Sequence, residues 1–332
     1  MSAATLIDVH AHIVPAGFPA TPASCSCGRW PAMAPRDRDR AAVVIGGKDF
    51  RIVDSRSWDP ARRVAELDAE DIALQVLSPM PELLSHWLDA QSALVMCRHV
   101  NGVIGEMVAA APDRFAGFGM VPMQNPELAA RELGRLRADY GLRGIEVGSH
   151  IDGRSPADPI FDVVWAEAER LDLCVFVHAL HPIGVERLVG PPGLAPFVAF
   201  PLDTSLAATG FITAGIPARF PKLKVMFSHG GGALAAVLPR LSFGWRTTPV
   251  LQSAFADPVA AARTLFYDSL VYDSAWLRHL IATFGASQLM MGTDYPFAIR
   301  QPLPGLWLEA AELDAEVADG LRSGNARRFL GL

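Results

Sequence analysis

Short apolar runs alternate with longer amphipathic segments along most of this chain. Eight such runs stand out, at residues 6–13, 72–80, 114–123, 142–150, 173–180, 223–232, 264–273 and 288–297. Near-continuous apolar runs of this length are typical of parallel strands that are buried on both faces. Three of the segments between the runs begin with an Asp-Pro or Asn-Pro pair, which suits a helix start, at 59–71, 125–140 and 158–172. Eight strand-helix units predict an α/β fold, a (β/α)8 TIM barrel in which residues 1–332 form a single domain.

Two segments interrupt this alternation. Residues 15–58 are far longer than the usual loop of about 2 to 6 residues between a strand and its helix. We interpret 15–58 as an insertion, and two strand-like runs around Gly46-Gly47 predict a β-hairpin within it. The second segment, residues 181–205, contains five prolines and is predicted to be a long loop. Both segments follow strands, which places them at the C-terminal rim, where barrel enzymes carry their chemistry.

Composition narrows the possible partners. The 332-residue chain is 51% hydrophobic and 19% charged, which is a globular composition. Its formal net charge of -6 comes without a basic block, so we expect a small-molecule partner and neither nucleic acid nor a membrane surface. The four cysteines are few, and the N-terminus lacks the regions of a signal peptide, which predicts a cytoplasmic protein with free thiols. No apolar stretch reaches the ~20 uninterrupted residues of a membrane-spanning helix.

Side chains that can bind a metal lie at the ends of several predicted strands. His10 and His12 are two residues apart on the first strand, so both imidazoles point to the same face. Asp8 precedes these two histidines on the same strand. His178, His229 and Asp294 lie near the ends of the fifth, sixth and eighth runs. A single buried histidine is more often a core residue bonded to a carbonyl, but several at the strand ends of one barrel favour a metal site. Imidazole and carboxylate suit a divalent transition metal, zinc first. The candidate ligands are His10, His12, His178 and Asp294.

Four motifs in this order resemble a known enzyme group. They are DVHAHI in the first run, VFVH in the fifth, FSHGGG in the sixth and GTDYPF in the eighth. Together they resemble the amidohydrolase superfamily and, within it, the aminocarboxymuconate-semialdehyde decarboxylase family, over nearly the whole chain. That family consists of metal-dependent TIM barrels, commonly zinc enzymes, that remove a carboxylate from small unsaturated or aromatic acids without oxidation. The resemblance implies a metal-dependent carboxy-lyase that acts on aminocarboxymuconate semialdehyde or a close analogue.

The resemblance also assigns roles to individual residues. One divalent metal, Zn²⁺ first with Mn²⁺ or another divalent ion as the alternative, matches the ligands His10, His12, His178 and Asp294. His229 matches the family's acid/base histidine beside the metal-bound water. A metal lowers the pKa of such a water from about 15.7 toward 7, and the imidazole takes and returns the proton. In the reaction that the resemblance implies, the activated water or its proton is delivered to the carbon that bears the carboxylate, and CO2 leaves as that carbon becomes tetrahedral.

Further residues match the substrate side of the family's site. Arg51, in the predicted hairpin, matches an arginine that holds a substrate carboxylate, and a guanidinium has the right geometry for that ion. Arg240 matches a second carboxylate-binding arginine, which the neighbouring subunit donates, so the resemblance implies a homodimer. Phe197 and Phe297 are expected to contact the substrate.

The chain departs from the family after the fifth strand. The family's His-Pro-Trp is replaced by His178-Ala179-Leu180, and His181 follows. These positions face the substrate, so its exact identity stays open. The main alternative is hydrolysis or hydration of a small carboxylated substrate, again with one metal, because the fourth run (IEVGSH) lacks the lysine that bridges two metals in many related hydrolases. A binding protein without activity would lack a ligand or a base, and none is missing.

Overall fold

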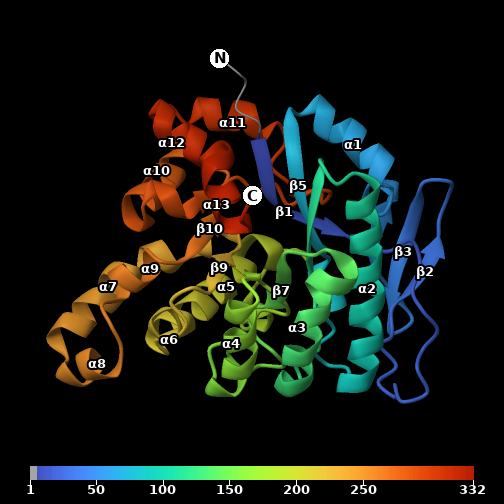
Figure 1. The fold of residues 1–332 in the computed structure, drawn as a ribbon, viewed down its shortest axis with the longest axis horizontal. Helices are drawn as coiled ribbons and strands as arrows, with labels where there is room; N and C mark the ends of the chain where they lie inside the picture. The colour runs from blue at the N-terminus through green and yellow to red at the C-terminus, as the bar shows by residue number, and fades with distance from the viewer. Residues whose placement is uncertain (1–5) are drawn as a thin grey trace.

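Eight parallel strands form the centre of the molecule in the computed structural model, which describes residues 6–332. They pair in the order β1-β5-β6-β7-β8-β9-β10-β11, so each strand lies beside the next one along the chain (Figure 1). Their bounds are Leu6–Ile13 (β1), Ile72–Pro79 (β5), Phe115–Gly119 (β6), Gly144–Gly148 (β7), Cys174–His178 (β8), Lys224–Phe227 (β9), Phe266–Asp268 (β10) and Leu289–Met290 (β11). Each of the eight predicted runs contains one of these strands, and the predicted TIM barrel is confirmed.

Backbone hydrogen bonds join the first strand to the segment around the last one. The amide of Val9 donates to the carbonyl of Met291 at 2.9 Å, and the amide of His12 donates to the carbonyl of Tyr295 at 2.7 Å. Tyr295 belongs to the loop after β11. The second bond therefore fixes the segment that carries Asp294 beside β1.

Helices follow the strands along the chain, and most of them cover the outside of the barrel. They are α1 (Pro60–Ala69), α2 (Ala90–Ala110), α3 (Pro126–Tyr140), α4 (Asp162–Arg170), α5 (Ala195–Thr213), α6 (Ile216–Arg219), α7 (Leu234–Thr247), α8 (Pro249–Ala254), α9 (Pro258–Ala262), α10 (Ser274–Phe284), α11 (Pro304–Ala310), α12 (Ala315–Asp319) and α13 (Asn325–Leu330). The side chains of Asp59 and Asn125 accept backbone amides at the starts of α1 and α3, as the Asp-Pro and Asn-Pro pairs predicted. The third predicted segment begins instead with a 3-10 helix, η3 (Pro159–Phe161), and α4 follows it.

The insertion after β1 contains a small antiparallel sheet. β3 (Arg40–Ile45) and β4 (Lys48–Asp54) form the predicted hairpin, and the turn residues Gly46 and Gly47 have φ angles of 59° and 76°. Glycine adopts these positive angles without strain, which explains both residues. A further strand, β2 (Ala32–Pro35), pairs with β3 and was not predicted. The hairpin bears on function because β4 carries Arg51.

The predicted loop over 181–205 is wrong in its second half. Helix α5 begins at Ala195 and continues through Pro201. Pro196 lies in the first turn, where the backbone amide that proline lacks would have no helical partner in any case. These prolines are therefore compatible with a helix start, and the segment before α5 is irregular apart from a 3-10 helix, η4 (Val185–Arg187).

Among residues 6–332, α5 is the one helix that is long and apolar enough to cross a membrane by length and composition alone. Helices that cover a protein core pass the same test. Here α5 packs against β8 and α7. Its buried Asp203 accepts a hydrogen bond from the hydroxyl of Ser149, after β7. In this structure α5 is therefore part of the outer layer of the barrel.

A compact apolar cluster fills the inside of the barrel at the end where the strands begin. It includes Phe118, Phe176 and Met226 from the strands and Phe329 from α13. Sγ of Cys174, at the start of β8, donates to the carbonyl of Phe329 at 3.0 Å, so α13 lies against that end. The larger apolar core lies between the strands and the surrounding helices.

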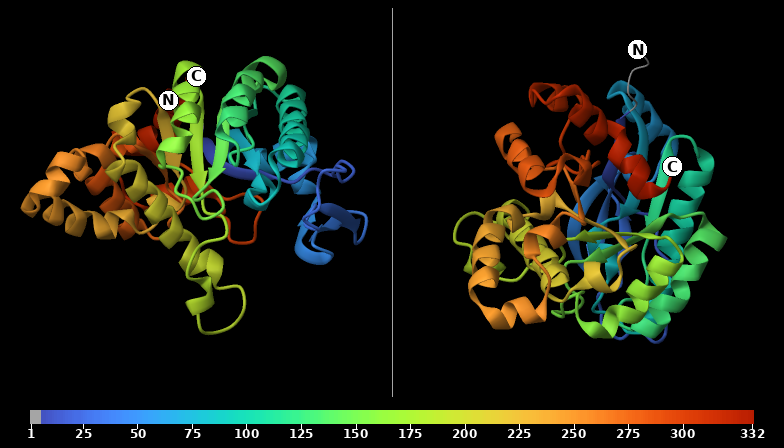
Figure 2. Two further views of the ribbon diagram at one scale, coloured as in Figure 1. Left: turned by 90° about the horizontal axis from the view of Figure 1, so that it is seen from below. Right: turned by 60° about the vertical axis from the view of Figure 1, so that its left-hand side comes forward.

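Helices α7 and α8 project from the barrel. In Figure 1 they form the end of the long axis opposite the β2-β3-β4 sheet, and the left panel of Figure 2 shows them standing away from the strands. Exposed apolar side chains lie on this pair and on the neighbouring α5: Leu202, Leu206, Val237, Phe243 and Val250. Groups of exposed apolar side chains are typical of surfaces that contact another molecule.

Candidate metal centre and active site

Four buried donor groups meet at the C-terminal end of the strands. His10 and His12 come from β1, His178 ends β8, and Asp294 follows β11. Their ligand atoms all lie within 4.8 Å of one another. Nε2 of His12 is 3.0 Å from Nε2 of His10 and 3.2 Å from Oδ1 of Asp294. The structure thus brings together the four residues that the sequence indicated as ligands.

The three histidines of this donor group are oriented by hydrogen bonds on the far side of their rings. Each ring donates from Nδ1 to an oxygen at 2.6 to 2.8 Å: His10 to Asp268, His12 to the carbonyl of Pro79, and His178 to the carbonyl of Ala179. A carbonyl or carboxylate oxygen only accepts, so each Nδ1 carries a hydrogen. Each Nε2 is then left to face the other donors. This is the orientation that a metal-binding imidazole needs.

The donor group fits a divalent cation. Nε2 of His178 and Oδ1 of Asp294 are buried and have no hydrogen-bond partner among residues 6–332, which is rare for polar atoms unless a ligand takes them. The ligand atoms lie 3.0 Å apart for His10 and His12, 3.2 Å for His12 and Asp294, and within 4.8 Å overall, so a single cation would be within reach of all four residues. Burial alone would lower the pKa of His12, but the carboxylates of Asp294 and Glu146 outweigh it and raise that pKa to about 9. The surroundings therefore favour positive charge at this place.

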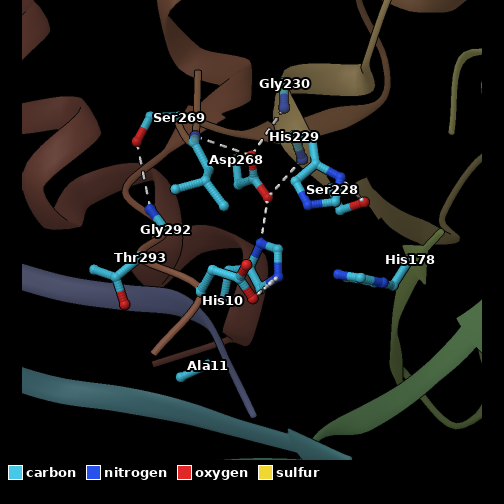
Figure 3. A network of polar contacts seen from close by, with 12 residues as sticks. His10, Ala11, His178, Ser228, His229, Gly230, Asp268, Ser269, Gly292 and Thr293 are labelled. Atoms are coloured by element: carbon cyan, nitrogen blue, oxygen red, sulfur yellow. Dashed lines mark hydrogen bonds and ion pairs between the residues drawn. The ribbon is translucent and has the colours of Figure 1, made fainter. Parts of the chain in front are cut away.

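Asp268, at the end of β10, connects the donor group to the loop after β9. Figure 3 shows its carboxylate between the ring of His10 and the backbone of His229 and Gly230. The amides of His229 and Gly230 donate to it at 2.9 and 2.8 Å. Burial raises the pKa of Asp268, but the hydrogen bond from His10 and the nearby amides outweigh burial and hold the pKa below its usual value. Asp268 was not among the candidates from the sequence, although an aspartate at a strand end was a usable signal.

Asp8 lies on β1 but does not join the donor group. Its carboxylate accepts hydrogen bonds from the side-chain amide Nε2 of Gln75 at 2.8 Å and from the hydroxyl of Thr293 at 2.6 Å. The pairing of β1 with β5 is irregular between Asp8 and Ala11, so the alternation of side chains is broken there. Burial raises the pKa of Asp8. Through Thr293 this carboxylate holds the backbone next to Asp294.

His229 lies beside the donor group without being part of it. Its ring centroid is 5.0 Å from that of His178 and 5.5 Å from that of His10. Nδ1 is 3.1 Å from Oγ of Ser228, which leaves Nε2 for proton exchange. Burial is the main cause that lowers the pKa of His229 to about 4, so the imidazole is neutral at neutral pH. A neutral imidazole beside a cation site is able to accept a proton.

The glycines after His229 allow a close approach between two elements. Gly232 has a φ of 61°, and a Cβ atom there would collide with the carbonyl oxygen of Pro201 in α5. The loop after β9 therefore passes directly against α5 only because this position is glycine.

A cavity of about 930 Å³ opens onto this end of the barrel. Its wall contains six of the residues that the sequence singled out, namely Arg51, His178, Phe197, His229, Asp294 and Phe297. An engineered cavity of about 150 Å³ is enough for a benzene molecule, so this one has room for a substituted ring or a muconate chain.

Arg51 and Phe297 reach the cavity from the hairpin and from the loop after β11. The guanidinium carbon of Arg51 lies 4.2 Å from the ring centroid of Phe297, and Phe297 stacks on His12 at 5.2 Å. Burial lowers the pKa of Arg51, and the carboxylates of Asp294 and Glu82 act on it without a hydrogen bond. Among residues 6–332 no carboxylate forms an ion pair with Arg51, and a guanidinium free in this way in a cavity wall is suited to bind the carboxylate of a ligand.

Arg240 does not reach the cavity of its own chain. It lies on α7 with its side chain exposed, and it is absent from the cavity wall. The donation of Arg240 by a neighbouring subunit therefore stays a prediction.

Known proteins resemble this chain over nearly its whole length. A family model described as Amidohydrolase matches residues 7–332. The 2-amino-3-carboxymuconate-6-semialdehyde decarboxylase of Dictyostelium discoideum is 35% identical over 331 residues, which cover 98% of this chain and 91% of that protein.

Solved structures share the fold. The 5-carboxyvanillate decarboxylase of Sphingomonas paucimobilis has a TM-score of 0.82 at 25% identity, covering 99% of this chain and 100% of that one. A dihydroxybenzoic acid decarboxylase from Polaromonas, solved with bound manganese and the inhibitor 2-nitroresorcinol, has a TM-score of 0.74 at 24% identity, covering 82% and 85%. The family model and the Dictyostelium relative decide the affiliation. This chain is an enzyme that belongs to the amidohydrolase superfamily and, within it, to the aminocarboxymuconate-semialdehyde decarboxylase family.

Proposed function

We propose that this enzyme is a metal-dependent, non-oxidative decarboxylase of a small unsaturated or aromatic carboxylic acid, aminocarboxymuconate semialdehyde or a close analogue. The observation that carries this proposal is that the donor group, His229 and Arg51 converge on one cavity. The names of the relatives support the reaction type, since they describe decarboxylases of unsaturated and aromatic acids.

The proposed metal site holds one divalent cation per chain. Its ligands are His10, His12, His178 and Asp294. Three imidazoles and one carboxylate suit Zn²⁺ first, with Mn²⁺ or another divalent ion as the alternative. When bound, the cation supplies positive charge that stabilises the negative charge developing on the substrate, and it makes a nearby water more acidic.

The side chains of this chain then have separate tasks in the reaction. Arg51 anchors a carboxylate of the substrate, while Phe197 and Phe297 contact its apolar part. His229 takes up a proton at Nε2 and delivers it to the carbon that bears the leaving carboxylate, where a C–H bond forms at the expense of a π bond. The bond from that carbon to the carboxylate then breaks, its electron pair restores the π bond, and CO2 leaves. One proton is consumed for each CO2, and no oxidant is needed.

We further propose a homodimer in which α7 of each chain supplies Arg240 to the cavity of the other. Val237 and Phe243, also on α7, are 43% and 62% exposed, and the helix projects from the barrel. An arginine amid apolar side chains is costly to bury unless it meets an anion. The carboxylate of a bound substrate would be such an anion.

We also propose that the chain forms a single domain of a cytoplasmic enzyme, with 15–58 as an insertion. The match to the family model spans residues 7–332, which include the insertion. The four cysteines are free, which suits a reducing compartment.

The function is tested by measuring CO2 release. Protein loaded with Zn²⁺ or Mn²⁺ is incubated with aminocarboxymuconate semialdehydes and with a panel of hydroxybenzoates, and metal content is determined by elemental analysis. We expect one metal per chain and one CO2 per molecule of substrate consumed, without oxygen uptake, and no activity after the metal is removed. Two metals per chain, or turnover of amides or lactones without CO2 release, would contradict the proposal.

A further inference from the structure

A carboxylate-histidine pair lines the cavity in addition to the donor group. Glu82 lies in the 3-10 helix η2 (Pro81–Leu84), directly after β5, and His181 follows the end of β8. Both side chains are part of the cavity wall. Oε2 of Glu82 accepts a hydrogen bond from Nε2 of His181 at 2.8 Å. Neither residue belongs to the donor group or takes part in the proposed proton transfer.

Two further side chains contact this pair. The ring of Trp87 stacks on His181 with a centroid distance of 5.0 Å. The guanidinium of Arg29 lies 4.1 Å from the centroid of Trp87 and 3.5 Å from Oε1 of Glu82. Trp87 and Arg29 are absent from the cavity wall, so Glu82 and His181 form the layer that a ligand meets.

The backbone of His181 is fixed in an unfavourable conformation. Its φ is 48°, in a region that residues other than glycine rarely adopt. Its carbonyl accepts a hydrogen bond from Nε2 of His150 at 2.9 Å. Such strain persists where the surroundings impose it, and it occurs most often at ligand sites. The imidazole is thereby held on Glu82, whose own exposed fraction is 7%.

The carboxylate of Glu82 keeps the capacity to bind a ligand. Oε2 is used by His181, whereas Oε1 has only the longer contact with Arg29 among residues 6–332. A carboxylate accepts hydrogen bonds and never donates them, so it attracts a hydroxyl or amino group and repels a second carboxylate. Arg51, in the same cavity, attracts a carboxylate and repels a positively charged group. One ligand therefore meets a place for its carboxylate and a place for a hydrogen-bond donor.

We propose that Glu82, positioned by His181, determines substrate specificity by binding a hydroxyl or amino substituent of the acid. The substrate class is then a hydroxy- or amino-substituted unsaturated or aromatic acid. An acid with a methoxy group or a second carboxylate at that place is disfavoured. This inference rests on the proposed function, because it concerns the same cavity and the same class of acids.

Binding to a matched set of ring acids tests the inference. The metal-loaded protein is titrated calorimetrically with benzoate and with its 2- and 3-substituted hydroxy, amino, methoxy and carboxylate derivatives, which keep the first carboxylate and change one substituent. A hydroxy- or aminobenzoate should bind to the wild-type protein about tenfold or more tightly than the matched methoxy compound, as expected for a charge-assisted hydrogen bond. Glu82→Gln should reduce that ratio about tenfold and tighten binding of the matched dicarboxylate, with unchanged affinity for benzoate.

Two further variants separate specificity from general damage. Glu132→Gln is the control, because Glu132 is also buried and bonded to an arginine, Arg98, but lies outside the cavity wall. Its binding ratios should equal those of the wild-type protein. His181→Phe keeps an aromatic ring against Trp87 and removes the N–H donor to Glu82. Its hydroxy-to-methoxy ratio should fall while benzoate binds normally, whereas a loosened cavity would weaken all ligands together and leave the ratio unchanged.

Two results would overturn the inference. One is a Glu82→Gln protein with wild-type ratios, and the other is a wild-type protein that does not distinguish donors from methoxy or carboxylate groups. Since the measurement is binding, it is separate from the test of the reaction. CO2 release with unchanged ratios refutes the role of Glu82 alone, and altered ratios without CO2 release from any acid refute the proposed function alone.

Discussion

Asp268 is the residue through which the donor group and the histidine proposed for proton transfer depend on each other. It accepts a hydrogen bond from Nδ1 of His10 at 2.6 Å and another from the backbone amide of His229 at 2.9 Å. A carboxylate behind a metal-binding imidazole fixes the ring and increases its basicity. The same carboxylate holds the loop in which His229 has a φ of 56°. Because Asp268 directly supports a proposed metal ligand, its substitution should above all weaken metal binding.

We expect Asp268→Asn to weaken metal binding by about 10- to 100-fold, because an amide oxygen accepts from Nδ1 of His10 less strongly than a carboxylate. Competition against a chromogenic chelator measures the metal dissociation constant. Asp257→Asn is the control, since Asp257 caps the short helix α9 and has no contact with the donor group. An unchanged dissociation constant in Asp268→Asn would mean that this carboxylate only supports the loop.

We expect His229→Ala to keep its metal while kcat falls by about 10²- to 10⁴-fold, the usual contribution of a general acid or base. The reason is that the four donors form a complete group without the ring of His229. Metal content and turnover are measured on the same sample. Loss of the metal from this variant would instead identify His229 as a ligand.

The pH profile gives a second measure of the same role. Because burial lowers the pKa of His229 to about 4 from the usual 6.5, the ring stays neutral until the pH falls well below 6.5. The wild-type rate should therefore decline on the acidic side and not near neutrality. The residual activity of His229→Ala should lack this acidic decline.

At the scale of elements, the sequence predicted those strands and site residues that depend on local patterns of apolar and polar residues. The eight strands were predictable because strands buried on both faces appear as apolar runs, and the donors at their ends followed from that placement. Helix α5 was missed because prolines in its first turns are also typical of loops. Asp268 ends a strand, which was a usable signal, but its role, like that of Glu82, comes from contacts with residues far away in the sequence, His10 and His181. No local pattern contains such contacts.

Helix α7 yields a prediction about assembly. If Arg240 acts in the partner's cavity, Arg240→Ala and His229→Ala chains each have only residual activity alone but complement each other when mixed. A mixed dimer has one cavity with both groups intact, so random exchange of equal amounts should restore about a quarter of the wild-type activity in a two-fold symmetric dimer.

A second mixture serves as the control for this experiment. Arg51 and His229 line the cavity of the same chain, so no mixed dimer of Arg51→Ala and His229→Ala has an intact cavity. This mixture should stay inactive. Absence of rescue for the Arg240 mixture, after subunit exchange has been verified by mass spectrometry of the native dimer, would remove Arg240 from the site.

At the scale of the whole molecule, folding buries titratable groups around the open end of the barrel. Outside the donor group, the clearest example of such a group is His86. Its exposed fraction is 5%, and neither ring nitrogen has a hydrogen-bond partner among residues 6–332. Burial, the largest cause, lowers its pKa to about 3 from the usual 6.5. The unfolded chain therefore binds more protons than the folded one between these two values. The contribution of His86 to stability is complete above pH 6.5 and is lost as the pH falls toward 3.

We expect His86→Phe to make the protein less sensitive to acid. From pH 8 to 5 the wild-type protein should lose about 2 kcal/mol of unfolding free energy at this site that the variant retains, since each pH unit below the unfolded pKa costs about 1.4 kcal/mol. Thermal midpoints of both proteins are compared at pH 8 and pH 5, so that the pH dependence of the metal site, common to both, cancels in the difference. The midpoint of the variant relative to wild type should rise by a few degrees on acidification, whereas an exposed histidine changed in the same way, His279→Phe, should leave the difference constant. If His86→Phe and wild type showed the same pH dependence, His86 would have to take up its proton in the folded protein at pH 5 as it does in the unfolded chain. The buried imidazolium would then need a hydrogen-bond acceptor.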